Sequence, residues 1–385
     1  MKQKRRLLLL ATASVLGLVL GGAALAGSAK TSLLTVHQSR AGAPLSPSAY
    51  TGLIRLAVQQ NSYRLGAPAD PGFVIFSEPD NDATAKITVF SPAGYTANLT
   101  QAPGTTVGQA FALVKAGALG NAILPLAGPV VVGNPADPAL QAASAQCRNG
   151  VTTNQEILVL NTSLQGQTIQ VPAFVNTAGP YTTQEICLPL PATAPFQAQL
   201  VLANYTVNGM FTNPAASAPA PGYQWVGDFT PYVGTVPNPA GTVEARTYVG
   251  LPSSLTFKRA KSKRSLVKFT GRLSIQGVNP AGIKLDLFYG AKTQPSPSYR
   301  KPSEKCILTR CTLLRSGTVK SNGTYTKTRK KVKRKTYFQA FLEDGWAFPT
   351  CNGPSPTGQP IPCREEILAP MISNQLLVKP PRRHR

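Results

Sequence analysis

Histidine and acidic side chains are scarce in this chain of 385 residues, which holds 2 His and 15 Asp and Glu. His37 lies in a polar stretch near the N-terminus and His384 lies in the C-terminal tail, so neither forms a recognisable pair with a nucleophile. This shortage excludes most histidine-dependent catalysis and most histidine metal sites. We expect neither a metal nor a cofactor.

The familiar catalytic motifs are also missing. The chain contains no phosphate-binding loop, no serine-hydrolase elbow and no zinc-protease motif. Glu78, Asp80 and Asp82 have the spacing of calcium ligands, but their loop lacks the glycine and the distal glutamate of an EF-hand. Paired carboxylates of a glycosidase leave no spacing signature. The sequence therefore predicts a protein that is not an enzyme, with an extracellular hydrolase as the third hypothesis.

Apolar runs long enough to span a membrane are missing after residue 26. Before that point, a basic start at 2–6 is followed by an apolar stretch over 7–20 and by small residues that end in Ala24-Leu25-Ala26. This pattern is typical of a cleaved secretory signal peptide over 1–26. It predicts an exported protein, secreted or associated with the cell envelope. A retained anchor helix over 7–26 is the alternative.

Six cysteines in an exported chain predict disulfides, at Cys147, Cys187, Cys306, Cys311, Cys351 and Cys363. If a domain boundary lies near residue 252, Cys147 has only Cys187 as a partner in its own domain. The other four cysteines allow three pairings, of which we favour Cys351 with Cys363. Zinc is the competing interpretation for Cys306 and Cys311, but no second pair has ligand spacing.

Negative charge is scarcest in the last third of the chain. Residues 27–255 hold 8 basic and 9 acidic side chains, whereas residues 256–385 hold 27 basic and 6 acidic ones. The whole chain has a net charge of +24. Outside the signal segment, almost all of the positive charge therefore belongs to the C-terminal part. We expect a flexible lead-in with one short helix over 27–65, a near-neutral β-sandwich region of one or two domains over 66–250, a basic domain over 256–376 and a basic tail over 377–385.

Short apolar or alternating runs separated by Pro, Gly and Asn predict an all-β fold. In the N-terminal region the candidate strands are 73–76, 86–90, 111–114, 130–132, 157–160, 168–171 and 199–207. Asp137 followed by Pro138 predicts the start of one helical turn. Leu53, Ile54, Ala57 and Val58 follow helical spacing after Ser48, although this run is also short enough for a strand.

Four aromatic residues gather within a short segment, at Tyr223, Trp225, Phe229 and Tyr232. They are a candidate platform for stacking on a carbohydrate. The alternative is that Trp225 and Phe229 fill a core and the two tyrosines line its edge.

The C-terminal domain carries two short motifs. One predicted strand holds Phe269, Gly271 and Leu273. A Pro280-x-Gly282 turn and an alternating strand follow it. Later, Asn322-Gly323-x-Tyr325 begins another strand. This order resembles the Ig-like repeats of bacterial secreted proteins, including the carboxypeptidase-regulatory-like, or prealbumin-like, domain. The resemblance covers about 255–345. It implies a β-sandwich with a structural or adhesive role and no catalytic residues. The segment over 291–311 and the cysteines depart from the pattern.

Basic residues of the C-terminal part form clusters. The first two are candidate sites for an anionic surface: Lys258, Arg259, Lys261, Lys263 and Arg264, and then Lys327, Arg329, Lys330, Lys331, Lys333, Arg334 and Lys335. A third cluster occupies 382–385. For an exported protein the expected partners are anionic cell-envelope polymers or lipids, or a polysaccharide, with no specific nucleic acid. A solvated, solubilising surface is the alternative.

These observations together predict a secreted, non-catalytic, envelope-associated or adhesive protein. Its fold class is all-β, with a β-sandwich region followed by an Ig-like β-sandwich domain. Its basic C-terminal domain is expected to bind anionic surface polymers. A carbohydrate-binding or accessory module that uses the segment around Trp225 is the second hypothesis.

Overall fold

The computed structural model describes residues 37–40, 50, 52–164, 166–215, 224–248, 250–260, 266–290, 312–330, 332, 334–342, 347–350, 364–368 and 371–379. Several predicted features lie outside these residues. They are the signal peptide, Tyr223, the cysteines at 306, 311, 351 and 363, and the basic residues Lys261, Lys263, Arg264, Lys331 and Lys333.

The fold is all-β, as the sequence predicts, and its N-terminal part is one antiparallel 13-stranded sheet. In spatial order its strands are β1 (His37–Arg40), β15 (Val243–Tyr248), β13 (Gln224–Val233), β4 (Thr84–Phe90), β10 (Tyr181–Cys187), β9 (Gln167–Ala178), β8 (Glu156–Leu164), β7 (Ala122–Val132), β6 (Thr106–Ala116), β11 (Ala198–Thr206), β3 (Pro71–Ser77) and β2 (Ile54–Gln60). A short strand β14 (Val236–Pro237) pairs with β13, and β5 (Thr96–Ala97) pairs with β12 (Phe211–Thr212). Short 3-10 helices are η1 (Gly117–Leu119), η2 (Pro195–Gln197) and η3 (Pro239–Gly241).

This sheet folds over until its ends meet, because β2 packs against β15 and β13. Two layers then face each other across one core, to which nearly every strand contributes. Side chains of β2 and β3 alternate between the core and the outside, with Ile54, Leu56 and Val58 buried on β2. Alternation with a period of two is the pattern of a sheet that buries one face. We call this part the N-terminal sandwich.

The run 157–160 is apolar throughout because β8 is covered on both faces. Leu158 and Leu160 point into the core, whereas Ile157 and Val159 pack under the helix α2 (Pro138–Cys147). The predicted start of this helix is confirmed, since Asp137 Oδ1 accepts a hydrogen bond from the backbone N–H of Ala139 at 2.8 Å. The helix is longer than the single turn that the sequence indicated.

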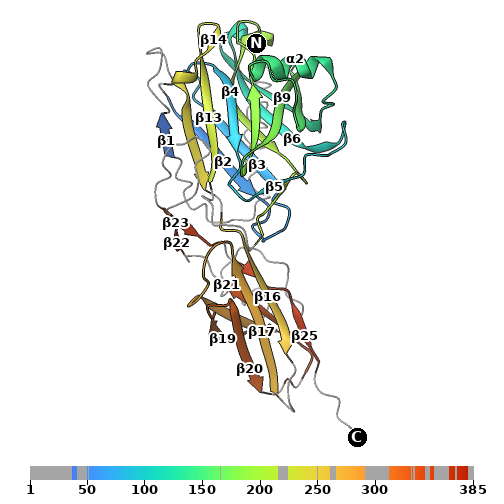
Figure 1. Cartoon of the computed structure of the whole chain (residues 1–385), viewed down its shortest axis with the longest axis vertical. Helices are drawn as coiled ribbons and strands as arrows, with labels where there is room; N and C mark the ends of the chain where they lie inside the picture. The colour runs from blue at the N-terminus through green and yellow to red at the C-terminus, as the bar shows by residue number, and fades with distance from the viewer. Residues whose placement is uncertain are drawn as a thin grey trace, which may run out of the picture.

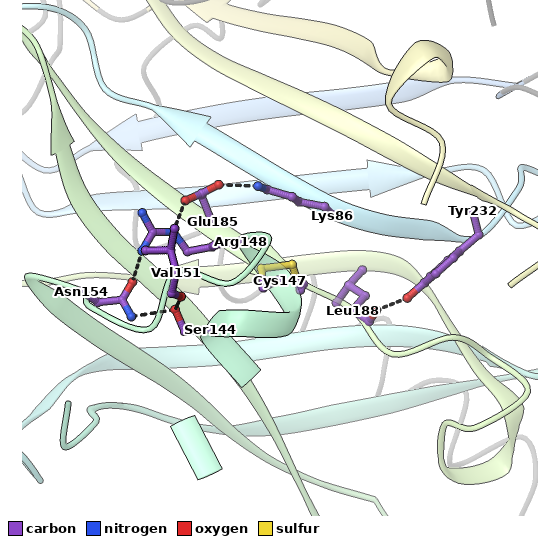
Figure 2. Close-up of a disulfide and its surroundings, with 10 residues drawn as sticks. Lys86, Ser144, Cys147, Arg148, Val151, Asn154, Glu185, Leu188 and Tyr232 are labelled. Atoms are coloured by element: carbon purple, nitrogen blue, oxygen red, sulfur yellow. Dashed lines mark hydrogen bonds and ion pairs between the residues drawn. A yellow bond between two sulfur atoms is a disulfide. The ribbon is translucent and has the colours of Figure 1, made fainter. Parts of the chain in front are cut away.

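A disulfide joins Cys147, at the end of α2, to Cys187, at the end of β10, which confirms the predicted pairing. Figure 2 shows the polar network beside it: Glu185 pairs with Lys86, and Arg148 Nε donates to Glu185 Oε2 at 2.6 Å. The bond closes a loop with a sequence separation of 40 residues. In the chain-entropy model a loop of this size contributes about 4 kcal/mol to stability.

The C-terminal part is a second β-sandwich, and Figure 1 shows it as a separate lobe. One sheet has the order β16 (Ser253–Ala260), β17 (Leu266–Ile275) and β20 (Thr324–Lys330). The facing sheet has the order β19 (Thr312–Thr318), β18 (Lys284–Gly290), β21 (Thr336–Leu342) and β24 (Met371–Ile372), with β25 (Leu376–Val378) also paired to β21. A two-stranded sheet, β22 (Ala347–Thr350) and β23 (Arg364–Ile367), completes it.

The two sandwiches have separate cores. In the second core, Phe257 and Phe269 from one sheet meet Leu285 and Phe338 from the other, and the rings of Phe269 and Phe338 lie 4.5 Å apart. The junction is made by backbone hydrogen bonds around Ser253, whose N–H donates to Tyr63 O at 2.8 Å and whose carbonyl accepts from Leu65 N–H at 3.1 Å. Ser253 therefore marks the end of the second sandwich that faces the first.

The helix predicted near 48–59 is wrong, because residues 54–60 form the strand β2. The apolar residues of this run fit both the helical period of 3.6 residues and the strand period of two. The strand forms because β3 offers a complete antiparallel partner, with Leu56 opposite Ile75 and Val58 opposite Phe73. Packing of a paired strand against a core outweighs the weak helical preference of one short run.

Candidate anion-binding end of the second sandwich

The pairing of strands brings the first two basic clusters to the same end of the second sandwich. β16 starts at the junction, where Ser253 pairs with Ile275, and ends where Ala260 pairs with Lys268. At that far end, Leu266 of β17 pairs with Lys330 of β20. The end of β16, with Lys258 and Arg259, and the start of β17, with Lys268, therefore lie beside the end of β20.

The facing sheet adds the chain end to this region. β21 begins with Thr336, which pairs with Val378, and ends with Leu342, which pairs with Met371. Met371 lies at the junction, since its sulfur accepts a hydrogen bond from Ser253 Oγ at 3.0 Å. The start of β21 and the end of β25 therefore lie at the far end, which places Arg334 and Lys335 of the second cluster there together with Lys379.

We call this far end the basic end. Its described cations are exposed, and they are Lys258, Arg259, Lys268, Arg334, Lys335 and Lys379. The described acidic residues of this sandwich lie nearer the junction. Asp286 pairs in register with Phe341, in the half of β21 near the junction. Strand β23, which contains Glu365 and Glu366, lies toward the first lobe in Figure 1. Positive charge is thus concentrated at the end of the molecule farthest from the N-terminal sandwich.

Sequence analysis missed Lys268 of this group, and also Arg272, which lies on the same strand closer to the junction. Runs of basic residues drew attention to the clusters, whereas Lys268 and Arg272 alternate with apolar residues inside β17. That alternation was the available signal. In a strand with Val267, Phe269 and Leu273 buried, residues of the other parity must face solvent.

The aromatic segment is divided between core and edge. Trp225 and Phe229 have no exposed surface and belong to the core of the N-terminal sandwich. Trp225 lies edge-on to Phe73 and Phe211, with ring centroids 5.1 and 5.2 Å away. Tyr232 is half-buried, and its hydroxyl donates to Leu188 O at 2.8 Å (Figure 2). Trp225 and Phe229 therefore cannot serve as an exposed stacking platform, which corrects that hypothesis.

Two carboxylates lie opposite each other on neighbouring strands of the N-terminal sandwich. Asp228 of β13 pairs in register with Glu244 of β15, which is fully buried and forms an ion pair with Arg246. Burial, and then the negative charge of Glu244, raise the pKa of the Asp228 carboxyl to about 7, although Arg246 and Lys86 oppose the shift. Glu244 is fully buried and already bound to Arg246, so its carboxylate is committed to an ion pair within the fold.

This raised pKa predicts that Asp228→Asn stabilises the protein in alkaline solution. The folded state holds the Asp228 proton more tightly than the unfolded state does, so its contribution is complete below about pH 4 and is lost as the pH rises toward 7. The full shift corresponds to about 4 kcal/mol, and we expect about half of it after local relaxation. The measurement is the urea midpoint of both proteins at pH 4 and pH 8.

The variant should gain stability over the wild type only at the higher pH. Asp80→Asn is the matched control, because the Asp80 side chain is 98% exposed and should leave the pH profile unchanged. Equal profiles for Asp228→Asn and the wild type would show that folding does not shift the pKa of Asp228.

An apolar cavity of about 100 Å³ lies within the N-terminal sandwich. Its walls are almost entirely aliphatic, and its polar groups come from Thr84, Thr162, Gln199 and Tyr205. None of the side chains that line it is a carboxylate, serine or histidine. This cavity therefore offers no support for the hydrolase hypothesis.

The described residues contain neither a metal-binding cluster of side chains nor a membrane-spanning helix. Among the described residues, no three His, Cys, Asp or Glu side chains gather closely enough to hold a metal ion. Within the same ranges, no helix has both the length and the apolar character needed to cross a membrane.

No protein-family model matches the chain, and no curated protein matches it with significant similarity.

Proposed function

We propose that this protein is an exported, non-catalytic protein of the cell envelope, whose basic end binds anionic surface polymers. One observation carries the proposal: basic residues from separate parts of the chain, at the end of β16, at the starts of β17 and β21 and just after β25, lie at one end of the second sandwich. A merely solubilising surface needs no such convergence. In this proposal the N-terminal sandwich is held away from the surface, and the second sandwich is an Ig-like adhesive module.

Export is supported by the disulfide. Cys147 and Cys187 are bonded in the structure, and disulfides persist in oxidising compartments outside the cytoplasm. Together with the signal-peptide pattern over 1–26, this favours a secreted or envelope-bound protein. In that compartment the available polyanions are envelope polymers.

The test is binding of the mature chain to isolated cell envelopes at several salt concentrations. Binding should weaken steeply between about 0.05 and 0.5 M salt, because charge attraction is screened over shorter distances as salt increases. Lys258→Gln with Lys268→Gln should weaken binding about 30-fold at 0.1 M salt, since each basic residue near an anionic surface contributes about 1 kcal/mol.

The matched control removes two exposed cations from the N-terminal sandwich, as Arg55→Gln with Arg64→Gln. It changes the net charge by the same amount and should leave binding within about threefold of the wild type. Binding that ignores salt, or that responds equally to both double variants, would contradict the proposal.

A further inference from the structure

The outer face of the sheet β16–β17–β20 carries a regular array of cations and hydroxyl groups. In register, Lys258 of β16 lies beside Thr270 of β17 and Thr326 of β20, and the next row places Arg272 between Thr256 and Thr324. The row toward the far end places Lys268 between Ala260 and Thr328. Each of these rows across the three strands therefore contains one cation.

The described members of the array face solvent. Thr256, Lys258, Lys268, Arg272 and Thr326 are exposed, whereas the alternating residues Phe257, Phe269 and Tyr325 are buried in the core. Lys258, Lys268 and Arg272 form no ion pair within the described part of the chain. We call this surface the cationic face.

Among the residues that the structure describes, the outer face of the opposite sheet shows no such array of cations and threonines. Its outward positions include Phe288, Gln339 and Phe341, which are buried, and Asp286, which accepts a hydrogen bond from Ser316 Oγ at 2.6 Å. The array is therefore a property of one sheet and does not follow from the overall charge of the domain.

We propose that the cationic face binds a linear phosphodiester polymer with short polyol spacers, laid along the strands. This proposal rests on the proposed function and names its polymer. Rows recur every second residue, which corresponds to about 7 Å along a strand. A chain of glycerol phosphate units carries one negative charge per short, flexible unit, so successive phosphates reach successive rows.

The side chains of the face match phosphate oxygens. Lysine and arginine supply charge-assisted donors, and the threonine hydroxyls beside them supply neutral donors, which are the groups that proteins use on phosphate backbones. The Thr256 hydroxyl donates to Arg272 O at 3.3 Å and the Thr324 hydroxyl donates to Asn322 Oδ1 at 2.7 Å, so the neutral donors that the described face offers to phosphate are those of Thr270 and Thr326.

Two other phosphate sources fit the face less well. Proteins that bind single-stranded nucleic acid stack bases on aromatic side chains, and here the aromatic residues of the three strands point inward. A lipid surface favours apolar side chains that enter it. In the described part of this sandwich the one exposed large hydrophobic residue is Leu377, on the other sheet.

The experiment titrates the mature chain with poly(glycerol phosphate) oligomers long enough to span the rows, at 0.1 M salt. Polygalacturonate of equal charge, a single-stranded oligonucleotide and phosphatidylglycerol vesicles are the comparison ligands. We expect poly(glycerol phosphate) to bind at least about tenfold more tightly than each of these, because only it combines phosphate with thin spacers. Tighter or equal binding of any comparison ligand would overturn the assignment.

Variants locate the site. The face variant, Lys258→Gln with Lys268→Gln and Arg272→Gln, should weaken poly(glycerol phosphate) binding about 100-fold. The matched variant, Lys284→Gln with Arg55→Gln and Arg64→Gln, removes the same charge from exposed positions that lie outside this face and outside the basic end, and should cost no more than about threefold. Circular dichroism checks that both variants fold.

A third variant keeps every charge. Thr270→Val with Thr326→Val removes two hydroxyl groups from one row and should weaken binding several-fold. Equal losses in the two charge variants, or no loss in the threonine variant, would overturn the polymer site while leaving the proposed envelope binding intact. Failure of the wild type to bind every polyanion would instead contradict the proposed function itself.

Discussion

Replacing Trp225 by alanine is expected to lower the free energy of unfolding of the N-terminal sandwich by about 4 kcal/mol. The side chain has no exposed surface and fills the space between Phe73, Tyr95 and Phe211. Alanine would leave a cavity that the surrounding rings cannot close, because both layers of the folded sheet are held in place by the hydrogen bonds between their strands. Urea unfolding followed by hydrogen exchange of the β3 and β13 amides measures the loss in this sandwich alone.

Two companion variants make this result specific. Trp225→Phe retains an aromatic ring and removes the indole N–H, which is buried without a partner in the described part of the chain, so it should cost less than half as much. Val236→Ala truncates a side chain that is 63% exposed and should change stability by less than about 0.5 kcal/mol. An alanine variant as stable as the wild type that no longer binds a polysaccharide would restore the stacking-platform hypothesis.

The Trp225 segment also shows what local patterns predict well. Trp225 and Phe229 are an even number of positions apart, which in a strand places them on the same face. That face points into the core. Alternation located β4, and short apolar or alternating runs located β3, β8 and β11, because each of these strands buries one or both faces. Local alternation therefore predicted the class of fold and most of its strands.

Non-local pairing could not be predicted in the same way. The run at 54–60 contains both helical and alternating apolar positions, and only the presence of β3 beside it decides between them. The basic end has the same origin. The sequences of Lys258–Arg264, Lys327–Lys335 and the tail do not predict at which end of the sandwich each segment begins or ends. That placement depends on the registers of β16, β17, β20, β21 and β25.

The second large effect is expected at Gly271, the glycine of the motif that resembles Ig-like repeats. A Cβ atom built at this position would lie 2.3 Å from Thr256 O and 2.3 Å from the Tyr325 ring. Tyr325 is opposite Gly271 in register, and its hydroxyl donates to Thr256 O at 3.0 Å. The glycine therefore provides the space in which this tyrosine crosses β17 and binds β16.

We expect Gly271→Ala to destabilise the second sandwich by about 3 kcal/mol or more, as other overpacked cores do. The ring of Tyr325 could turn aside, but Thr256 O is fixed by the pairing of β16 with β17 and must move with its strand. Tyr325→Phe keeps the ring and loses one hydrogen bond, so it should cost only about 1 kcal/mol. Hydrogen exchange of the peptide 266–275 reports both losses without interference from the first sandwich.

A double-mutant cycle separates the two clashes. If the tyrosine ring contributes, Gly271→Ala should cost at least about 1 kcal/mol less in a Tyr325→Ala background than in the wild type. Additive costs would mean that the clash with Thr256 O alone sets the effect. Either way, Gly271 and Tyr325 fix the register of the three strands whose outer positions hold Lys258, Lys268 and Arg272. The spacing of the cationic face is therefore set from the core beneath it, and a variant that shifts this register should lose poly(glycerol phosphate) binding with every cation still in the chain.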